Sequence, residues 1–446
     1  MAWRSASGCQ PKVTCVRTYP APIPLPARTG DNSVVMRPHR RVGSRAPFIG
    51  IIAATLALLV PLSTFAADNQ WTSLKRVTSI GGSRLDSLHQ FSADRGQLHL
   101  VHPRIGPNRT DDRVVYQRSR DNGASWTMEV PLFTSTSQRR HVMPNLAIDA
   151  RGGVVAVAFR VRGPQEDSLF VRVSGNDGGS FDARQEVFSV AGGDGIGVPA
   201  IAVGNDFVAV AWTDRSNGKV KLRVSRDEGR SFGKARTMGR TKLSIDCKRR
   251  LTDGLVALAA ADKVLHLAWS HAPSRSCLAS SIKMRTSRDR GKDWSKTRTV
   301  TKRRSYGWPE LDARDRTVVA TVQAPNGGLI VARSGKAGRG WRTRMLKAPK
   351  GYGFSAADIV LLPEKKAMIS YVVERIRKNR LVNTKVVSRR SPDDGRSWVA
   401  AKTVAGREKR LRMAPNLANN QKKVTLVVQS GSLDGSPRNV FASRLR

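Results

Sequence analysis

The sequence has 446 residues, of which 39% are hydrophobic and 6% aromatic. This apolar content is enough for a large core, which excludes a chain too polar to fold, and internal repeats decide how many domains the length represents. The 78 lysine and arginine residues outnumber the 34 aspartate and glutamate residues, so the formal net charge is +44. A charge of this sign and size favours polyanions as partners.

The first 67 residues are expected to precede the folded domain. Residues 1–35 are rich in Pro, Arg and Ser, and we expect a disordered or untranslated extension, with translation starting at Met36. Residues 36–67 read as a secretory signal peptide: a basic region, an apolar run from Phe48 to Leu62, and a small-residue cleavage site near Ala66. We therefore expect an exported protein, periplasmic or extracellular, without a membrane span after cleavage. An uncleaved N-terminal anchor is the alternative.

An octapeptide that recurs six times organises residues 68–446. Five close copies follow the pattern S-x-D-x-G-x-S-[WF] and occupy residues 119–126, 174–181, 225–232, 287–294 and 391–398. Two of them depart from it at one position: Asn176 replaces the Asp, and Asp293 replaces the second Ser. A short Asp or Ser side chain can bond its own turn, the Gly allows a positive φ, and the aromatic residue anchors the next strand. The sixth copy, residues 334–341 (SGKAGRGW), lacks the Asp. A turn tolerates that loss better than a catalytic or calcium site does, so we interpret the octapeptides as structural turns.

A second periodic signal lies between the octapeptides. Short runs rich in Val, Ala and Trp start 49 to 57 residues apart at residues 98–101, 154–159, 207–212, 264–269, 318–322, 367–373 and 424–428. Continuous apolar runs bounded by turns suit strands buried on both faces. Each run is surrounded by three further strand-like pieces, and four-stranded units at a fixed period predict a β-propeller.

The two ends of the domain are expected to share one blade. Seven apolar runs accompany only six octapeptides, because the chain stops just after the strand at residues 440–443. The segment Trp71-Thr72-Ser73-Leu74 mirrors the opening of the strand that follows the first octapeptide. The sequence therefore predicts an all-β, seven-bladed propeller of four-stranded antiparallel blades. Residues 71–78 are expected to complete the last blade and to cover its exposed edge.

The octapeptide resembles the Asp-box of the sialidase (BNR-repeat) superfamily, and the resemblance covers nearly all of the chain after residue 70. It implies a propeller that binds ligands at the face built from second-to-third loops and blade-to-blade crossings. Sialidases use a Tyr nucleophile with a Glu, a carboxylic acid and three arginines, the first of which stands two residues before a proline. Here the residues two before Pro144, Pro309 and Pro415 are Val142, Gly307 and Met413. We therefore expect a non-catalytic member.

The expected ligand face is crowded with arginines, whose planar forks suit carboxylate, sulfate or phosphate oxygens. We expect this face to bind an anionic glycan or another polyanion, in a monomer without a cofactor or metal, and nucleic acid only non-specifically. A solvated basic surface without a ligand is the alternative. The candidate ligand-binding residues are Arg104, Arg139, Arg140, Arg249, Arg250, Arg303, Arg304, Arg375, Arg377, Arg410 and Arg412.

Two other functions stay open. An exo-sialidase-like glycoside hydrolase acting on acidic sugars would draw its catalytic groups from Tyr306, Tyr352, Glu310, Glu374 and Asp86, each of which also suits an ordinary loop residue. A scaffold for protein assembly at the cell envelope would instead show a broad apolar area on one face.

Two cysteines, Cys247 and Cys277, follow the expected signal peptide. The first falls in the crossing into blade 4 and the second in the second-to-third loop of that blade. Because exported proteins commonly form disulfides, we expect these two residues to pair, with two free buried thiols as the alternative.

Overall fold

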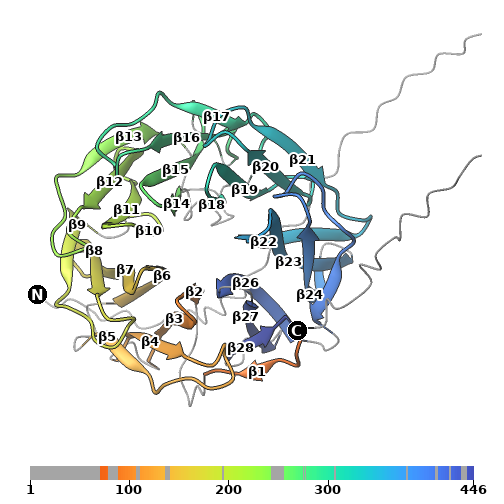
Figure 1. Ribbon diagram of the computed structural model, residues 1–446, viewed down its shortest axis with the longest axis horizontal. Coiled ribbons are helices and arrows are strands. Elements are labelled where there is room, and N and C mark those ends of the chain that lie inside the picture. Colours follow the sequence, from red (N-terminus) through yellow and green to blue (C-terminus); the bar gives the residue numbers. More distant parts are fainter. Residues whose placement is uncertain are drawn as a thin grey trace, which may run out of the picture. The chain divides into compact units, whose positions relative to one another are not determined.

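The computed structural model of the chain describes residues 71–78, 89–106, 111–135, 141–192, 195–242, 256–274, 276, 278–305, 308–377, 380–406, 410–420, 423–432 and 439–445. These residues form 28 strands in seven four-stranded sheets, which are the blades of a propeller (Figure 1). The expected all-β propeller is therefore confirmed. No helix among the described residues is long and apolar enough to cross a membrane.

Each of the first six blades consists of four consecutive antiparallel strands, which follow one another from the innermost outward. Blade 1 contains β2 (Gln90–Asp94), β3 (Gln97–Arg104), β4 (Arg113–Ser119) and β5 (Val130–Thr134). Blade 2 contains β6 (His141–Arg151), β7 (Val154–Arg162), β8 (Glu166–Ser174) and β9 (Gln185–Ala191). Blade 3 contains β10 (Ala200–Gly204), β11 (Phe207–Asp214), β12 (Lys219–Ser225) and β13 (Arg236–Arg240).

The next three blades repeat this order. Blade 4 contains β14 (Val256–Ala261), β15 (Val264–His271), β16 (Ser281–Ser287) and β17 (Arg298–Thr301). Blade 5 contains β18 (Glu310–Arg314), β19 (Thr317–Gln323), β20 (Leu329–Ser334) and β21 (Arg342–Leu346). Blade 6 contains β22 (Tyr352–Leu362), β23 (Lys366–Arg377), β24 (Arg380–Ser391) and β25 (Lys402–Ala405).

Blade 7 combines the two ends of the domain. It contains β26 (Arg410–Asn420), β27 (Lys423–Ser432) and β28 (Asn439–Arg444), with β1 (Lys75–Arg76) as its outermost strand. Lys75 pairs with Ala442, and Trp71 forms a further bridge with Leu445. Because β26 also packs against β2 of blade 1, the ring is closed and the outer edge of β28 is covered, as the sequence predicted.

The apolar runs form the second strand of each blade and are buried on both faces. In β11 every residue is buried. Val208 and Trp212 belong to a cluster shared with blade 2, whereas Phe207 and Ala211 belong to one shared with blade 4. Alternate side chains of β11 therefore pack against the blades on its two sides and join three blades. Burial of each large apolar side chain contributes about 1.5–3 kcal/mol to the free energy of folding.

The octapeptides form tight turns between the third and fourth strands. In the first one, the Ser119 hydroxyl donates to Asp121 at 2.8 Å and accepts the N–H of Gly123 at 2.7 Å, while Asp121 accepts the N–H of Ser125 at 2.8 Å. Asn122 and Gly123 both have positive φ, 57° and 84°. The sequence predicted a positive φ only at the Gly, but the residue before it also adopts one. The fourth and fifth residues of all six octapeptides have this left-handed conformation in the described chain.

Carboxylates on the innermost strands join neighbouring blades. Asp149 of β6 accepts the N–H of Val203 in β10 at 2.8 Å, and Asp358 of β22 accepts the N–H of Leu417 in β26 at 2.6 Å. The innermost strand is the free edge of each blade, and its buried N–H groups need acceptors. These aspartates therefore satisfy the inner edge of the next blade, a role that the sequence pattern did not predict.

Candidate functional site

The candidate catalytic residues of blade 6 do not come together. Tyr352 of β22 lies opposite Arg375 of β23, whereas Glu374 lies opposite Gly353. Neighbouring residues of a strand point to opposite faces of a sheet, so Tyr352 and Glu374 occupy different faces of the blade. Glu374 is buried and its Oε1 accepts the Ser355 hydroxyl at 2.5 Å. Burial raises the pKa of Glu374, although this hydrogen bond opposes the shift.

Glu310 lies on β18 in the gap between blades 5 and 6. It shares a strand face with Asp312, which bonds to blade 6. Burial and the nearby Asp358 carboxylate hold the pKa of Glu310 well above its usual range. The expected partner Tyr306 and the candidate acid Asp86 lie outside the described residues.

Arg104 of the candidate ligand face is already engaged in an ion pair. Its Nε lies 2.8 Å from Oε2 of Glu129, and the Glu129 Oε1 lies 3.6 Å from Nε2 of His102. Burial lowers the pKa of His102 to about 4, so this imidazole is neutral at pH 7. The Arg104 side chain is therefore partly neutralised and held in place by Glu129.

Three other predicted arginines are exposed. Arg303 and Arg304 follow β17 of blade 4, and Arg375 lies near the end of β23. Arg377, Arg410 and Arg412 lie on β23 and β26, but their side chains are not among those described. Arg139, Arg140, Arg249 and Arg250 lie outside the described residues, as do both cysteines, Cys247 and Cys277.

A groove lies between the outer edges of blades 4 and 5, where Arg303 meets residues that were not among the sequence-based candidates. Its volume is about 700 Å³. On one side it is lined by β17 and the residues after it, and on the other by the start of β21. The lining residues are Arg298, Thr299, Val300, Thr301, Lys302, Arg303, Gly340, Trp341 and Thr343. We call this hollow the rim groove.

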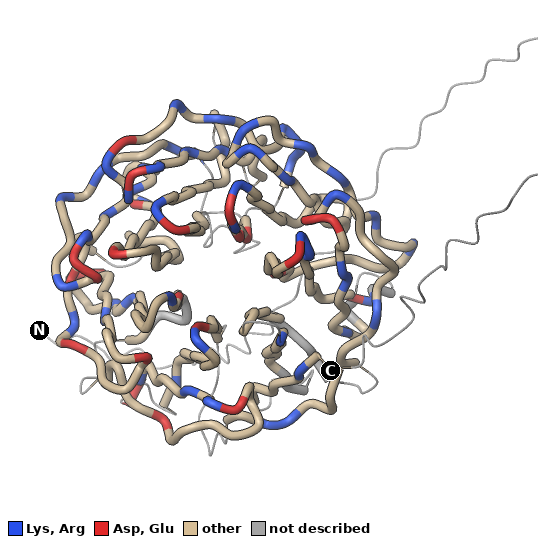
Figure 2. Tube along the Cα trace, in the orientation of Figure 1, with Lys and Arg blue, Asp and Glu red and all other residues tan. Residues whose placement is uncertain are grey.

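The rim groove combines one aromatic ring with three cations. Trp341 packs on the blade 4–5 core, and its Nε1 donates to the carbonyl of Gly338 at 3.1 Å, which fixes the plane of the indole. Arg298, Lys302 and Arg303 are exposed, and the lining contains no carboxylate. Lys and Arg positions recur around the whole outer rim, so the groove lies within a broadly positive field (Figure 2).

The sequence analysis did not predict Trp341 or Arg298 as ligand-binding residues. The aromatic residues of the octapeptides suit packing, and the expected ligand contacts lay only in the loops of one face. The degenerate sixth octapeptide could have indicated Trp341, because Gly340 precedes this Trp where the other copies have Ser or Asp. Gly340 brings no side chain to the groove that it lines.

No group of three or more His, Cys, Asp or Glu side chains in the described part of the chain is placed to hold a metal ion. The aspartates of the inner strands accept backbone N–H groups. Asp312, for example, accepts hydrogen bonds from Ala313 at 2.7 Å and from Leu361 at 2.6 Å.

Solved structures similar to this chain include sialidases and other glycosidases. The NanB sialidase from Streptococcus pneumoniae aligns with a TM-score of 0.49 and 11% identity over 71% of this chain and 70% of its own. The phage phi92 endosialidase aligns at 0.48 and 10% over 84% and 69%. An alpha-L-arabinanase from Penicillium chrysogenum aligns at 0.45 and 11% over 71% and 98%. No family model and no curated protein matches the chain. The seven-bladed propeller itself follows from the strand pairing of this chain.

Proposed function

We propose that this protein binds an anionic glycan through the rim groove between blades 4 and 5. One observation carries the proposal: Trp341 lines the same hollow as the exposed cations Arg298, Lys302 and Arg303, without a carboxylate among the lining residues. An aromatic ring offers a flat apolar surface for a sugar ring. Arginine forks bind carboxylate or sulfate groups in two-point geometry.

The size and openness of the groove suit part of a chain. Small-molecule pockets are commonly about 300–1,000 Å³, and the rim groove falls within that range at about 700 Å³. Because β17 and β21 are the outermost strands of their blades, a polymer can enter and leave the groove without threading through the protein. We therefore favour an internal segment of an acidic polysaccharide as the ligand.

Binding explains the described residues better than glycoside hydrolysis. Catalysis by a Tyr and Glu pair requires the two side chains within hydrogen-bonding reach. Tyr352 and Glu374 occupy opposite faces of blade 6, and Glu374 is buried against Ser355. The groove requires no such pair, because charge and stacking suffice for recognition.

The proposal is tested with a sulfated heparin-derived hexasaccharide, an oligogalacturonate and neutral maltohexaose. Replacing both Arg298 and Arg303 with Ala should weaken binding of the two anionic probes about tenfold or more, which is about 1.4 kcal/mol or more. The matched control replaces Arg226 and Lys234 of blade 3, two exposed cations outside the groove, and should change affinity less than about twofold.

Neutral maltohexaose should bind far more weakly than either anionic probe. Equal losses in the groove variant and the blade 3 control would show a general effect of net charge and would overturn the assignment. Preferential binding of maltohexaose would overturn the requirement for an anion.

A further inference from the structure

The sixth octapeptide differs from the others in a way that changes its charge. In the five close copies, an Asp or Asn at the third position accepts the N–H of the seventh residue at 2.7–3.0 Å. Hydrogen bonds from Ser225 and Ser231 lower the pKa of Asp227 to about 2. The turn therefore holds an acceptor oxygen at this position, which is a carboxylate in four of the five copies and the amide of Asn176 in the other.

The sixth copy keeps the turn but loses its internal anion. Ala337 and Gly338 have the same left-handed pair of φ angles, 48° and 79°. Ala337 also donates its N–H to the carbonyl of Arg316 at 2.8 Å, which docks the turn onto the β18–β19 connection. The third position is Lys336, whose ammonium has donors only and cannot accept the N–H of Gly340.

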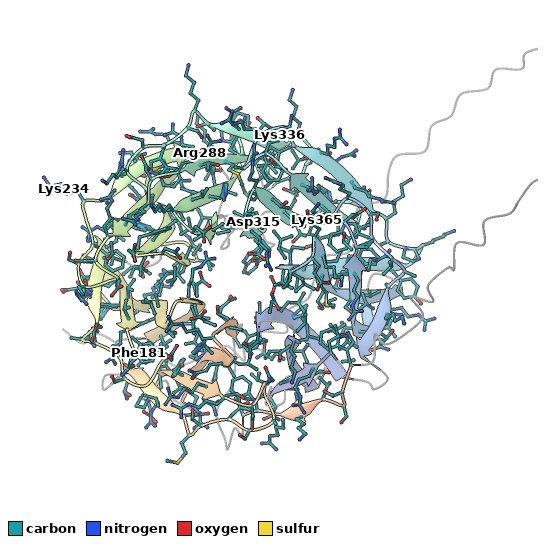
Figure 3. All side chains as sticks on the ribbon, viewed as in Figure 1. Phe181, Lys234, Arg288, Asp315, Lys336 and Lys365 are labelled. Carbon is teal, nitrogen blue, oxygen red and sulfur yellow. The ribbon has the colours of Figure 1, made fainter. Side chains whose placement is uncertain are left out.

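A separate pocket of about 360 Å³ adjoins this turn, at the junction of blades 4 and 5. Four cations from three segments line it: Arg288 from the blade 4 octapeptide, Arg316 from the β18–β19 turn, and Lys336 and Arg339 from the sixth octapeptide. Figure 3 labels Arg288 and Lys336 in the part of the ring formed by blades 4 and 5. Asp315 is the only acidic residue of the lining, and its carboxylate lies 3.9 Å from Arg314.

Two other blade junctions neutralise a cation with an ion pair between blades. Arg290 pairs with Asp206 at 2.8 Å between blades 4 and 3, and Arg333 pairs with Asp394 at 3.5 Å between blades 5 and 6. Ala337 occupies the position of Asp394 in the sixth copy. Within the described part of the chain, the four cations of the pocket, Arg288, Arg316, Lys336 and Arg339, form no ion pair.

We propose that the pocket beside the sixth octapeptide is a binding site for a tetrahedral oxyanion, either a phosphate or a sulfate group. The lining has a formal net charge of +3, from four cations and one carboxylate. Arginine forks and a lysine ammonium together match the three outer oxygens of such a group. The site uses none of the rim groove residues, so it does not depend on the function proposed above.

One substitution separates this proposal from a merely basic surface. Lys336→Asp restores the third residue of the repeat, so its carboxylate should occupy the anion position and accept the N–H of Gly340. The thermal midpoint should stay equal or rise, whereas the affinity for inorganic phosphate or sulfate should fall about tenfold or more. The matched control is Lys234→Asp, which makes the same charge change at an exposed position after the blade 3 octapeptide.

Isothermal titration with inorganic phosphate, inorganic sulfate and a trisulfated disaccharide distinguishes the sources of the oxyanion. Binding of the inorganic ions that is lost in Lys336→Asp but kept in Lys234→Asp supports a site for the free ion. Binding of the disaccharide alone, with the same dependence on Lys336, supports a site for a sulfate ester. Equal affinities in the original protein and both variants, for all three probes, would overturn the site.

The rim groove provides an independent check. The Arg298 and Arg303 double variant should retain inorganic oxyanion binding, and Lys336→Asp should retain binding of the oligogalacturonate. Oligogalacturonate binding that the Arg298 and Arg303 double variant keeps, beside oxyanion binding that depends on Lys336, would contradict only the proposed function. Oxyanion binding that Lys336→Asp keeps, beside oligogalacturonate binding that depends on Arg298 and Arg303, would contradict only this inference.

Discussion

The Oδ2 atom of Asp312 accepts the backbone N–H of Leu361 at 2.6 Å, so a carboxylate of blade 5 satisfies the inner edge of blade 6. Burial, together with the charges of Asp149 and Asp358, raises the pKa of Asp312 to about 7 against the opposing effect of its two backbone hydrogen bonds. Folding therefore favours the protonated form of this residue. The inner ring of the propeller is consequently sensitive to pH.

The contribution of Asp312 to stability should fall as pH rises from 6.5 to 8. The folded protein binds more protons at Asp312 than the unfolded chain does throughout the interval between its unfolded pKa of 3.8 and its folded pKa of about 7. Buried histidines such as His89, whose pKa burial lowers to about 4, act in the opposite direction, and their effect fades above their unfolded pKa of 6.5. Asp312→Asn isolates the carboxylate and should flatten the decline by about 1 kcal/mol or less. Denaturant melts at pH 6.5, 7.2 and 8 measure this slope, and an unchanged slope would contradict the assignment.

Removal of one partner from the buried ion pair of blade 2 should be costly. Arg160 and Asp167 are both fully buried and lie 2.5 Å apart, and Asp167 also accepts the N–H of Ile196 at 2.9 Å. Arg160→Met leaves a buried charge without its partner and should cost about 3–5 kcal/mol in unfolding free energy.

The exposed pair Arg113 and Asp111, at 2.8 Å, is the matched control for that variant. Arg113→Met should cost less than about 1 kcal/mol, because water already screens both charges. Equal midpoints of the two variants in guanidinium chloride would refute the role given to burial.

Closure of the ring should depend on residues 71–78. The Trp71 Nε1 donates to Ser388 at 3.0 Å, and the Ser443 hydroxyl donates to the Thr72 carbonyl at 2.6 Å. Removal of residues 1–78 exposes the edge of β28 and should replace a single cooperative thermal transition with a broad transition or aggregation. A protein that starts at residue 68 should melt as one unit. Identical scanning calorimetry traces from the two proteins would show that β1 is dispensable.

Two glycines with similar backbone angles should differ in their tolerance of alanine. Gly229 of the blade 3 octapeptide has φ of 95°, and a Cβ there would lie 2.6 Å from Val173 of blade 2. Gly96 has φ of 84°, and nothing lies within 4 Å of its Cβ position. Gly96→Ala should cost about 1–2 kcal/mol from backbone strain alone. Gly229→Ala should cost about 1–3 kcal/mol more, because the neighbouring blade must move; equal urea midpoints would exclude that contact.

Most of the fold could be predicted because its determinants are local and repeated. The octapeptides and apolar runs are each short, and Trp71 mirrors Trp126 closely enough to reveal the shared blade. The inner-edge role of Asp312 could not be predicted, because its partner Leu361 lies in another blade and an aspartate in a strand carries no local signature. The positive φ of Asn122 was not predicted either. The fourth residue of the octapeptide varies among Asn, Asp, Glu, Arg and Ala, so no single residue type marks this conformation.

The site was harder to predict than the fold. The rim groove is lined by Arg298 of one blade and Trp341 of the next, and this arrangement depends on how two blades pack rather than on either segment. Tyr352 and Glu374 are close in blade 6 but point to opposite faces, which follows from strand register and not from residue type.

The central claim is that an acidic polysaccharide segment lies in the rim groove. Hydrogen–deuterium exchange with and without a saturating oligogalacturonate tests it most directly, because the method locates the bound ligand on the chain. We predict slower exchange at residues 298–303 and 340–343, with little change in blade 3. Protection confined to the second-to-third loops and the other blade crossings, with unchanged exchange at residues 298–303 and at Trp341, would contradict it.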